Sequence, residues 1–214
     1  MSILEEISMY LQQGKAPKVK ELVAQALEEG VAPGDILEKG LLAGMDVISV
    51  KFKNNEVFVP EVLIAARAMN MGVEILKPKL VEAGVESKGT AVIGTVFGDL
   101  HDIGKNIVKM MLEGKGINVV DLGTNVSAET FVQAAIDNDA DLICCSALLT
   151  TTMNEMKNVV EAAKAKGLDK KLKIMVGGAP ITQSFCEAIG ADYYTPDAAS
   201  AAEVAIEYCL SKKK

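Results

Sequence analysis

The spacing of apolar residues changes partway along the chain, and this change constrains the fold more than any other feature. The first segment carries apolar side chains at helical spacing, namely Ile3, Leu4, Ile7, Tyr10 and Leu11. Pro33 and Pro60 each stand where a helix would begin, because proline is favoured in the first helical turn. The pattern therefore predicts a bundle of four amphipathic helices over residues 1–85.

A polar, glycine-flanked stretch from Ala83 to Thr90 predicts a linker, and beyond it the pattern is different. Short apolar runs predict strands at Ala91–Phe97, Ile117–Leu122, Leu142–Ala147, Leu172–Val176 and Ala191–Tyr194. Helices are predicted between and after them, at Gly104–Glu113, Ala128–Asn138, Asn154–Lys166, Thr182–Ala188 and Ala198–Leu210. This alternation predicts a second domain over residues 89–214, built on a doubly wound, five-stranded parallel sheet with helices on both faces.

Charge and composition limit the binding partners and the cellular compartment that we expect for the chain. The formal net charge is -7, which disfavours nucleic acid as a partner, because such binding depends on neutralising phosphates. No run approaches the roughly 18 apolar residues of a membrane span, and Glu5 and Glu6 interrupt any signal-peptide core. The four cysteines show no CxxC spacing, which favours reduced, buried thiols over a zinc site. We expect a cytoplasmic protein without a membrane partner.

The chain has one histidine, His101, and it follows the first predicted strand. Ligands of doubly wound sheets bind at the carboxyl ends of the strands, and a neutral imidazole is a common metal ligand. Asp99 is suitably placed to accept a hydrogen bond from the second ring nitrogen, and Gly104 permits close approach of a bulky group. By themselves, however, a loop histidine and Asp99 and Asp102 could equally be surface, loop and helix-capping residues.

The same loop does not match the two common phosphate-binding motifs. Gly98 and Gly104 enclose five residues where a Walker A loop needs four, and Lys105 is followed by Asn106 where it needs serine or threonine. A Rossmann GxGxxG fingerprint is also missing from this position. Neither nucleotide-binding interpretation fits.

Two further strand ends carry small or hydroxylated residues. The third predicted strand is followed by the sequence SALLTTT, in which Ser146 could bond to a flat ligand. Turn formation and helix capping explain these hydroxyls equally well. The fourth predicted strand ends at Gly177 and Gly178, which indicate either a tight turn or a backbone pressed against a ligand.

In combination, the three loops resemble those of the cobalamin-binding domain family. The matching elements are Asp99-x-His101-x-x-Gly104, then Ser146-Ala147-Leu148, then Gly177-Gly178. The run DLHDIGKNIV at 99–108 resembles the methyltransferase branch, and residues 58–69 are similar to the helical cap of that branch, as in methionine synthase. The resemblance covers nearly the whole chain. It implies a helical cap followed by a flavodoxin-like (Rossmann-type) domain.

The resemblance also implies roles for particular residues. His101 would ligate cobalt in place of the displaced dimethylbenzimidazole tail, Asp99 would bind its other ring nitrogen, and Ser146 would complete a proton relay. Contacts with the cofactor would come from Leu100, Asp102, Ile103, Gly104, Leu148, Thr150, Gly177, Gly178, Ala179 and Tyr194. In the cap they would come from Phe58, Val62 and Met69, although these three could equally belong to the bundle core.

The function that the resemblance implies is that of a corrinoid carrier. It would shuttle a methyl group from a substrate-specific methyltransferase to an acceptor methyltransferase of the tetrahydrofolate or coenzyme M type, with a reductive activase as a further partner. The donor could be methanol, a methylamine, glycine betaine or an aromatic methyl ether, and the carrier itself would be non-catalytic. The alternatives are the cobalamin-binding subunit of a radical mutase and a corrinoid sensor. A flavodoxin relative fits less well, because its phosphate loop should be rich in serine and threonine.

Overall fold

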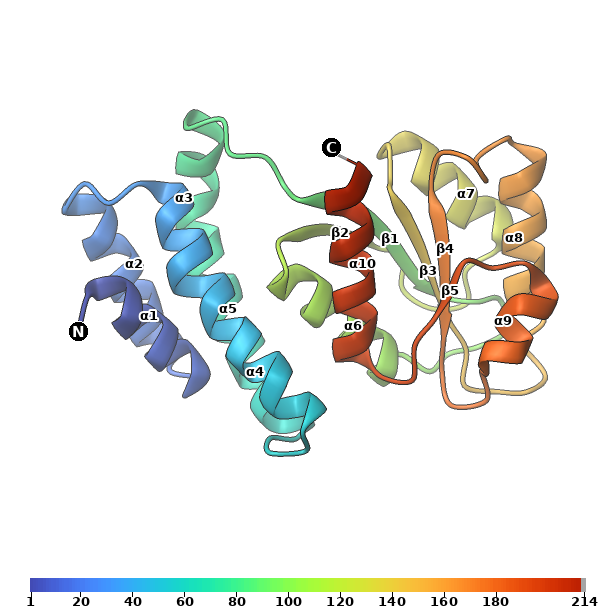
Figure 1. Cartoon of the computed structure of the whole chain (residues 1–214), viewed down its shortest axis with the longest axis horizontal. Coiled ribbons are helices and arrows are strands. Elements are labelled where there is room, and N and C mark those ends of the chain that lie inside the picture. The colour runs from blue at the N-terminus through green and yellow to red at the C-terminus, as the bar shows by residue number, and fades with distance from the viewer. Residues whose placement is uncertain (213–214) are drawn as a thin grey trace. The chain divides into compact units, whose positions relative to one another are not determined.

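The computed structural model describes residues 1–212 and divides into two compact units (Figure 1). One unit contains residues 1–87 and 114–116, and the other contains 88–113 and the chain from Ile117 onward. Lys213 and Lys214, the last residues of the predicted second domain, lie outside the described residues.

The first unit is the predicted helical bundle. Its elements are α1 (Ile3–Gln12), α2 (Ala16–Glu28), α3 (Pro33–Asp35), the π-helical η1 (Ile36–Leu42), α4 (Ala43–Lys53) and α5 (Val59–Glu82). Because α3, η1 and α4 follow one another without a break, they form the third of the four predicted helices. The π-helical turn inside it was not predicted.

Small residues let the helices of this bundle approach closely. A Cβ atom added to Gly40 would lie 3.1 Å from the Ile7 side chain, and one added to Gly72 would lie 2.9 Å from Leu41. Along α5, one stripe of the helix is buried, consisting of Val62, Ala65, Ala66, Ala68, Met69, Gly72 and Leu76. This stripe has the three- and four-residue spacing of a helix that packs one face into a core.

The second unit is the predicted parallel sheet. Its strands are β1 (Gly89–Thr95), β2 (Ile117–Asp121), β3 (Leu142–Ser146), β4 (Lys173–Gly177) and β5 (Tyr193–Tyr194), in the order β2-β1-β3-β4-β5. All four strand pairings are parallel. The helices are α6 (Ile103–Gly114), α7 (Ala128–Asp137), α8 (Glu155–Ala165), α9 (Gln183–Ile189) and α10 (Ala198–Lys212). The fold prediction is confirmed, and this strand order is that of the flavodoxin-like folds.

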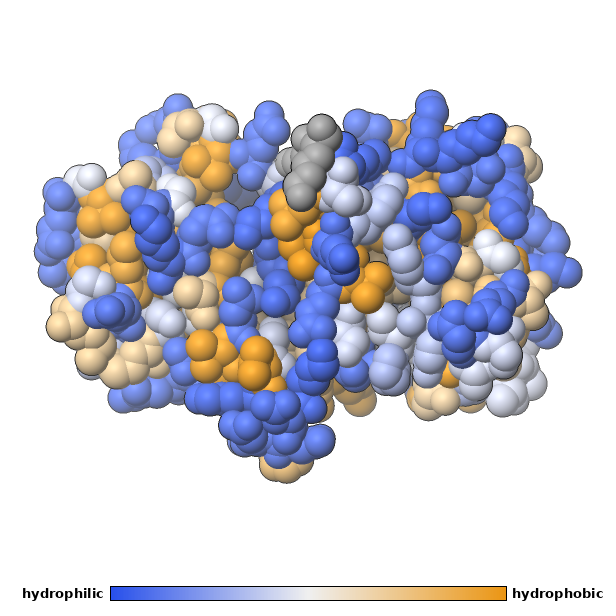
Figure 2. Space-filling model, viewed as in Figure 1, coloured by the Kyte–Doolittle hydropathy of each residue, from blue (hydrophilic) through white to orange (hydrophobic). Residues whose placement is uncertain are grey.

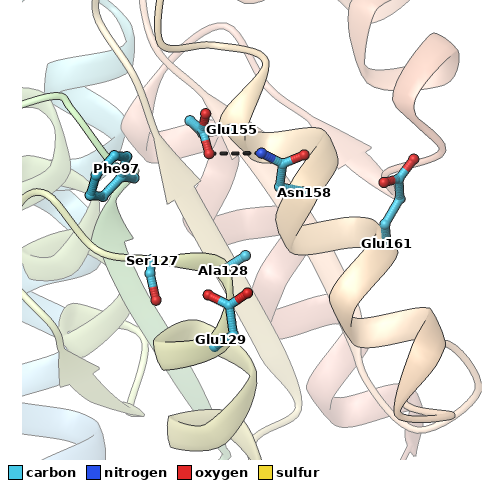
Figure 3. Close-up of a pocket in the computed structure, with 7 residues that line it drawn as sticks. All are labelled: Phe97, Ser127, Ala128, Glu129, Glu155, Asn158 and Glu161. Atoms are coloured by element: carbon cyan, nitrogen blue, oxygen red, sulfur yellow. Dashed lines mark hydrogen bonds between the residues drawn. The ribbon is translucent and has the colours of Figure 1, made fainter.

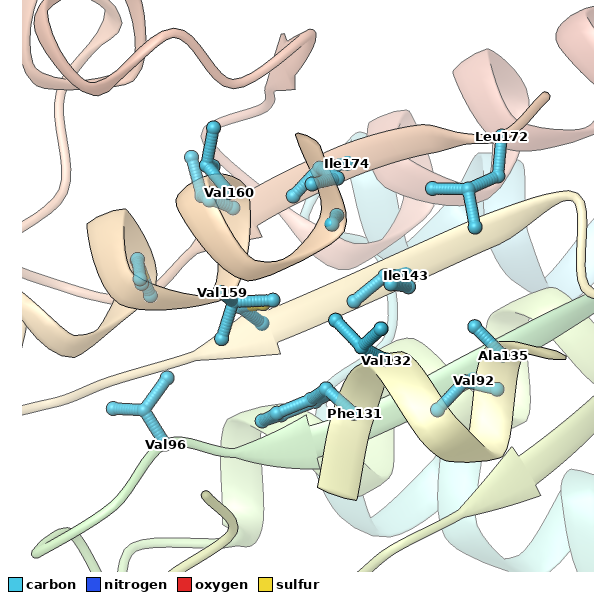
Figure 4. Close-up of a cluster of buried hydrophobic side chains, with 14 of the residues drawn as sticks. Val92, Val96, Phe131, Val132, Ala135, Ile143, Val159, Val160, Leu172 and Ile174 are labelled. Carbon is cyan, nitrogen blue, oxygen red and sulfur yellow. The ribbon is translucent and has the colours of Figure 1, made fainter. Parts of the chain in front are cut away.

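Alternation along the strands divides the core between two faces of the sheet. Val92, Ile143 and Ile174 belong to a cluster that α7, α8 and α9 cover, and Phe131 of α7 is fully buried in it (Figure 4). Ile93 and Cys144 alternate with these residues along their strands, so they point to the opposite face of the sheet. The helices α6 and α10 lie on that face (Figure 1). Both faces are therefore covered, as parallel sheets require.

The strand order places a topological switch point between β1 and β3. The chain leaves β1 through α6 toward β2 on one side, and it returns through α7 to β3 on the other side. Loops after β1 and β3 therefore diverge at the carboxyl ends of these strands, where doubly wound sheets bind their ligands. His101 lies in the first of these loops.

The surface is mainly hydrophilic in the view of Figure 2, with hydrophobic patches between the polar residues. Within residues 1–212, none of the helices combines the length and the apolar character needed to cross a membrane.

The four cysteines are buried thiols, and we expect them to be unreactive in the folded protein. Burial, with a smaller contribution from Cys209, raises the pKa of Cys144 to about 12, so its reactive thiolate is scarce at pH 8. An aromatic disulfide reagent should modify native protein slowly and all cysteines after unfolding. The Ser211→Cys variant, with a thiol on an exposed position, should react at once. Rapid modification of the unmutated native protein would contradict this burial.

Candidate functional site

The loop after β1 carries His101, and β1 itself fixes the backbone of this residue. Thr95, the last residue of β1, is fully buried, and its Oγ1 donates to the His101 carbonyl at 2.8 Å. Ile103 then begins α6. His101 is thus held between a rigid strand and a helix, which suits a residue that must present a ring in a fixed direction.

The imidazole of His101 is oriented by Asp99. His101 Nδ1 lies 2.7 Å from Asp99 Oδ1, and the His101 backbone N–H donates to the same oxygen at 3.1 Å. An ionised carboxylate only accepts hydrogen bonds, so Nδ1 carries the ring proton and the lone pair resides on Nε2. The side chain is 50% exposed, which leaves Nε2 accessible to a metal.

The second oxygen of Asp99 is equally well bonded. Oδ2 accepts from the backbone N–H groups of Leu148 and Leu149, at 2.9 and 3.2 Å, and from Thr152 Oγ1 at 2.8 Å. Burial by itself would raise the pKa of Asp99, but the donors from Leu148, His101 and Thr152 outweigh it and hold this pKa well below its usual range. Asp99 therefore stays ionised although its side chain is fully buried.

The hydroxyl that contacts Asp99 differs from the one expected from the sequence. Ser146 was expected to complete the relay, but within residues 1–212 its side chain makes no hydrogen bond with Asp99. The chain after β3 instead turns back toward the loop after β1. Thr152 therefore donates to Asp99, although the two residues are 53 positions apart in the sequence. The run of threonines at 150–152 was the available signal for this contact.

The glycines at the ends of the loops play two different roles. A Cβ atom on Gly104 or Gly177 would meet nothing within 4 Å, so the backbone there borders open space. At Gly178, φ is +133°, and a Cβ atom would lie 1.8 Å from the Ala147 carbonyl oxygen. Gly178 therefore allows the end of β4 to pack against the loop after β3, whereas Gly104 and Gly177 leave room for a ligand.

Large apolar side chains are exposed around His101. Leu100 and Ile103 are each 72% exposed, and Leu148 is 45% exposed. Grouped exposed apolar side chains are costly unless a partner or ligand covers them. With an accessible Nε2 and open space beside Gly104 and Gly177, these residues fit a broad, largely apolar cofactor whose metal is bound from one side.

The other residues assigned to the site from the sequence fall into three groups. Exposed residues of the strand-end loops are Asp102, Thr150 and Ala179, and Tyr194 is half-buried at the end of β5. In the helical unit, Phe58 is 63% exposed at the start of α5. Val62 and Met69, in contrast, belong to the buried stripe of α5.

A separate pocket lies between the starts of α7 and α8, with a volume of about 410 Å³ (Figure 3). It is lined by Phe97, Ser127, Ala128, Glu129, Glu155, Asn158 and Glu161. Its three carboxylates would repel the phosphate of a nucleotide tail. None of the residues assigned to the site from the sequence lines this pocket, so it is not the candidate cofactor site.

Comparison with known proteins identifies the ligand that this geometry fits. Two family models, both described as B12 binding domain, match residues 89–206 and residues 3–77. The chain belongs to the B12-binding family. Its cofactor is accordingly a cobalamin or related corrinoid, and the first of these regions contains the loops that carry His101, Thr152 and Gly177.

Relatives extend the match over almost the whole chain. Dimethylamine corrinoid protein 3 of Methanosarcina acetivorans is 44% identical over 97% of both chains. A corrinoid protein of Desulfitobacterium hafniense is 42% identical over 96% of both. The structure is similar to a chain of the methanol:cobalamin methyltransferase complex of Methanosarcina barkeri, with a TM-score of 0.86 and 31% identity over 98% of this chain and 84% of that one. The chain is a corrinoid protein of the methyltransferase type.

Proposed function

We propose that this B12-binding protein carries methyl groups between two enzymes. It would accept a methyl group at one methyltransferase, which binds the donor, and deliver it at a second, which holds tetrahydrofolate or coenzyme M. When bound, the corrinoid supplies the cobalt atom that takes up and releases the methyl group. The observation that carries the proposal is the Asp99–His101 pair, whose Nε2 is directed away from the carboxylate at the switch point of the sheet.

In this proposal His101 would hold the cobalt through Nε2, in place of the dimethylbenzimidazole tail. Asp99 keeps the ring proton on Nδ1, and Thr152 donates its hydroxyl to the far oxygen of Asp99. A carboxylate on the second nitrogen raises the basicity of a ligating imidazole. A proton gained or lost along His101, Asp99 and Thr152 would therefore change how strongly His101 binds the metal.

The displaced tail would enter the unit beside the two open glycines. Gly104 and Gly177 border free space, and the exposed Leu148 and Thr150 would form its walls. Ala179 and Tyr194 would lie at its rim.

Residues 1–85 would act as the cap of the cofactor and residues 89–214 as the domain that binds it. Within the cap, the exposure of Phe58 supports it as a contact, whereas the burial of Val62 and Met69 favours a core role.

The partners would be a substrate-specific methyltransferase, an acceptor methyltransferase and a reductive activase. Relatives named for dimethylamine and trimethylamine, together with the methanol complex, make methylamines and methanol the first donors to test. The four buried cysteine thiols support a reducing compartment such as the cytoplasm. The chain would be a carrier and not a complete enzyme.

The proposal is tested by loading the purified protein with hydroxocobalamin and desalting it. We expect the corrin absorbance to stay with the protein. After reduction, adding a dimethylamine, trimethylamine or methanol methyltransferase with its substrate should convert the spectrum to that of the methylated cofactor. Protein that emerges colourless would refute the carrier function. A protein that stays coloured but is methylated in none of the three systems would contradict the choice of donors.

A further inference from the structure

We propose that residues Asp121–Asn125, the last residue of β2 and the four that follow it, form a positioning clamp for the loop that carries His101. This clamp holds both ends of the segment Gly98–Lys105 and so sets the direction of His101 Nε2. The inference rests on the proposed role of His101 as the cobalt ligand. It assigns a function to two residues, Lys105 and Asn125, that the cofactor site itself leaves unexplained.

Asn125 holds the first end of the loop through two hydrogen bonds. Its side-chain Oδ1 accepts from the Gly98 N–H at 2.8 Å, and its own N–H donates to the Asp99 carbonyl at 3.0 Å. The backbone of Asn125 has a φ of +55°, a left-handed conformation that asparagine, aspartate and glycine tolerate best. This conformation allows one residue to reach both neighbouring peptide groups.

Asp121 holds the second end through Lys105. The Lys105 side chain is only 2% exposed, and its Nζ donates to Asp121 Oδ1 at 2.6 Å and to Asn106 Oδ1 at 2.8 Å. A buried ammonium group without a carboxylate partner is strongly unfavourable, so Lys105 can stay in this place only while Asp121 faces it. Because Lys105 lies in the first turn of α6, this ion pair fixes the start of the helix that follows His101.

The middle of the clamp is itself attached to the end of β1. The Gly123 carbonyl accepts from the Thr95 N–H at 2.9 Å, and the Gly123 N–H donates to Asp121 Oδ1 at 3.0 Å. Thr95 in turn donates its hydroxyl to the His101 carbonyl. The clamp, the end of β1 and the His101 loop thus form one hydrogen-bonded unit.

The clamp is expected to fix the position of the His101 imidazole precisely. Metal ligands must be held to within about 0.5 Å of their working geometry by the residues behind them. Loss of a residue that orients a ligand typically lowers metal affinity about 10- to 100-fold. We therefore expect the clamp to affect how well His101 ligates cobalt more strongly than it affects the stability of the fold.

The test uses the full chain and two substitutions at Asn125. Asn125→Gly keeps the left-handed backbone but removes Oδ1, whereas Asn125→Asp keeps both an acceptor and the tolerance for this backbone. Thr182→Ala is the matched control, because it removes a side-chain oxygen that accepts from the Phe185 N–H at 3.2 Å in the N-cap of α9. Lys105→Met breaks the second attachment of the clamp, and it leaves no buried charge unpaired because Asp121 Oδ2 still accepts from Lys109 Nζ at 3.2 Å.

Two readouts are compared, one without cofactor and one with it. In cofactor-free protein, Asn125→Gly should speed hydrogen exchange of the Gly98 amide about tenfold or more, while Asn125→Asp and Thr182→Ala should not. In loaded protein, Asn125→Gly and Lys105→Met should weaken hydroxocobalamin binding about tenfold and reduce the share of cobalt ligated by histidine. Asn125→Asp should keep both the hydroxocobalamin affinity and the share of histidine-ligated cobalt close to those of the unmutated protein.

Three outcomes would overturn the inference, and they are distinguishable. Unchanged exchange at Gly98 in Asn125→Gly would show that Asn125 does not anchor the loop, whatever the cofactor does. Faster exchange with unchanged histidine ligation would show that the anchor does not position His101. If the unmutated protein retains no corrinoid at all, the proposed function fails first, and the clamp loses its role in ligation with it.

Discussion

The Gly178→Ala variant is expected to lose about 3 to 5 kcal/mol of unfolding free energy. Two costs combine at this position. A φ of +133° is accessible essentially only to glycine, and an added Cβ atom would lie 1.8 Å from the Ala147 carbonyl oxygen. Backbone cannot move aside as a flexible side chain can, so β4 and the loop after β3 would have to separate. Urea unfolding of cofactor-free protein, followed by circular dichroism, measures the loss.

Gly177→Ala is the matched control for this prediction. The two glycines are neighbours, but a Cβ atom on Gly177 would meet nothing within 4 Å. We expect its unfolding free energy to stay within about 0.5 kcal/mol of the unmutated protein, as for a surface substitution. If both variants unfold at the same urea concentration, the close contact between Gly178 and Ala147 is not a constraint on the fold.

The Asp99→Ala variant is expected to damage both folding and cofactor binding. The carboxylate accepts five hydrogen bonds, two at Oδ1 and three at Oδ2, and its side chain is fully buried. Removing it leaves the donors of His101, Leu148 and Leu149 without their acceptor, whereas Thr152 Oγ1 can still donate to the Leu149 carbonyl at 3.0 Å. We expect a loss of about 4 kcal/mol in unfolding free energy and of about 10- to 100-fold in corrinoid affinity.

Graded variants separate these two effects of Asp99. Thr152→Val removes a single donor and should cost about 1 kcal/mol, while leaving the bond between Asp99 and His101 Nδ1 in place. Asp102→Ala removes an exposed aspartate of the same loop, whose Oδ2 accepts from Asn106 Nδ2 at 3.1 Å, and it should have little effect on stability. Equal destabilisation by Asp99→Ala and Asp102→Ala would show that burial and bonding of Asp99 are unimportant.

Apolar periodicity was sufficient to predict the architecture of both units. The strands differ from their predicted bounds by at most about two residues, as at β1, which covers Gly89–Thr95 instead of Ala91–Phe97. Such patterns are clear when a strand is buried on both faces, because nearly all its residues are then apolar. The π-helical turn in η1 was missed, because it depends on backbone hydrogen bonding that leaves no mark in apolar spacing.

The candidate site was predictable where it lies within one loop and less so where it depends on tertiary contacts. Asp99 and His101 are two residues apart, so their pairing could be inferred from sequence. Thr152 reaches Asp99 only because the chain after β3 turns back, and the sequence favoured Ser146 at the strand end instead. Asn125 was missed for the same reason, since its bond to Gly98 joins segments 27 residues apart.

The most direct test of the central claim uses the fact that His101 is the only histidine in the chain. Untagged protein labelled with ¹⁵N-histidine is loaded with unlabelled cobalamin, reduced to the cobalt(II) state and examined by electron paramagnetic resonance. If His101 ligates cobalt, the nitrogen splitting of each line changes from the triplet of ¹⁴N to the doublet of ¹⁵N. A triplet that persists in labelled protein would mean that the dimethylbenzimidazole nitrogen still binds cobalt, and the absence of nitrogen splitting would mean that neither does. Either result would contradict the role assigned to His101.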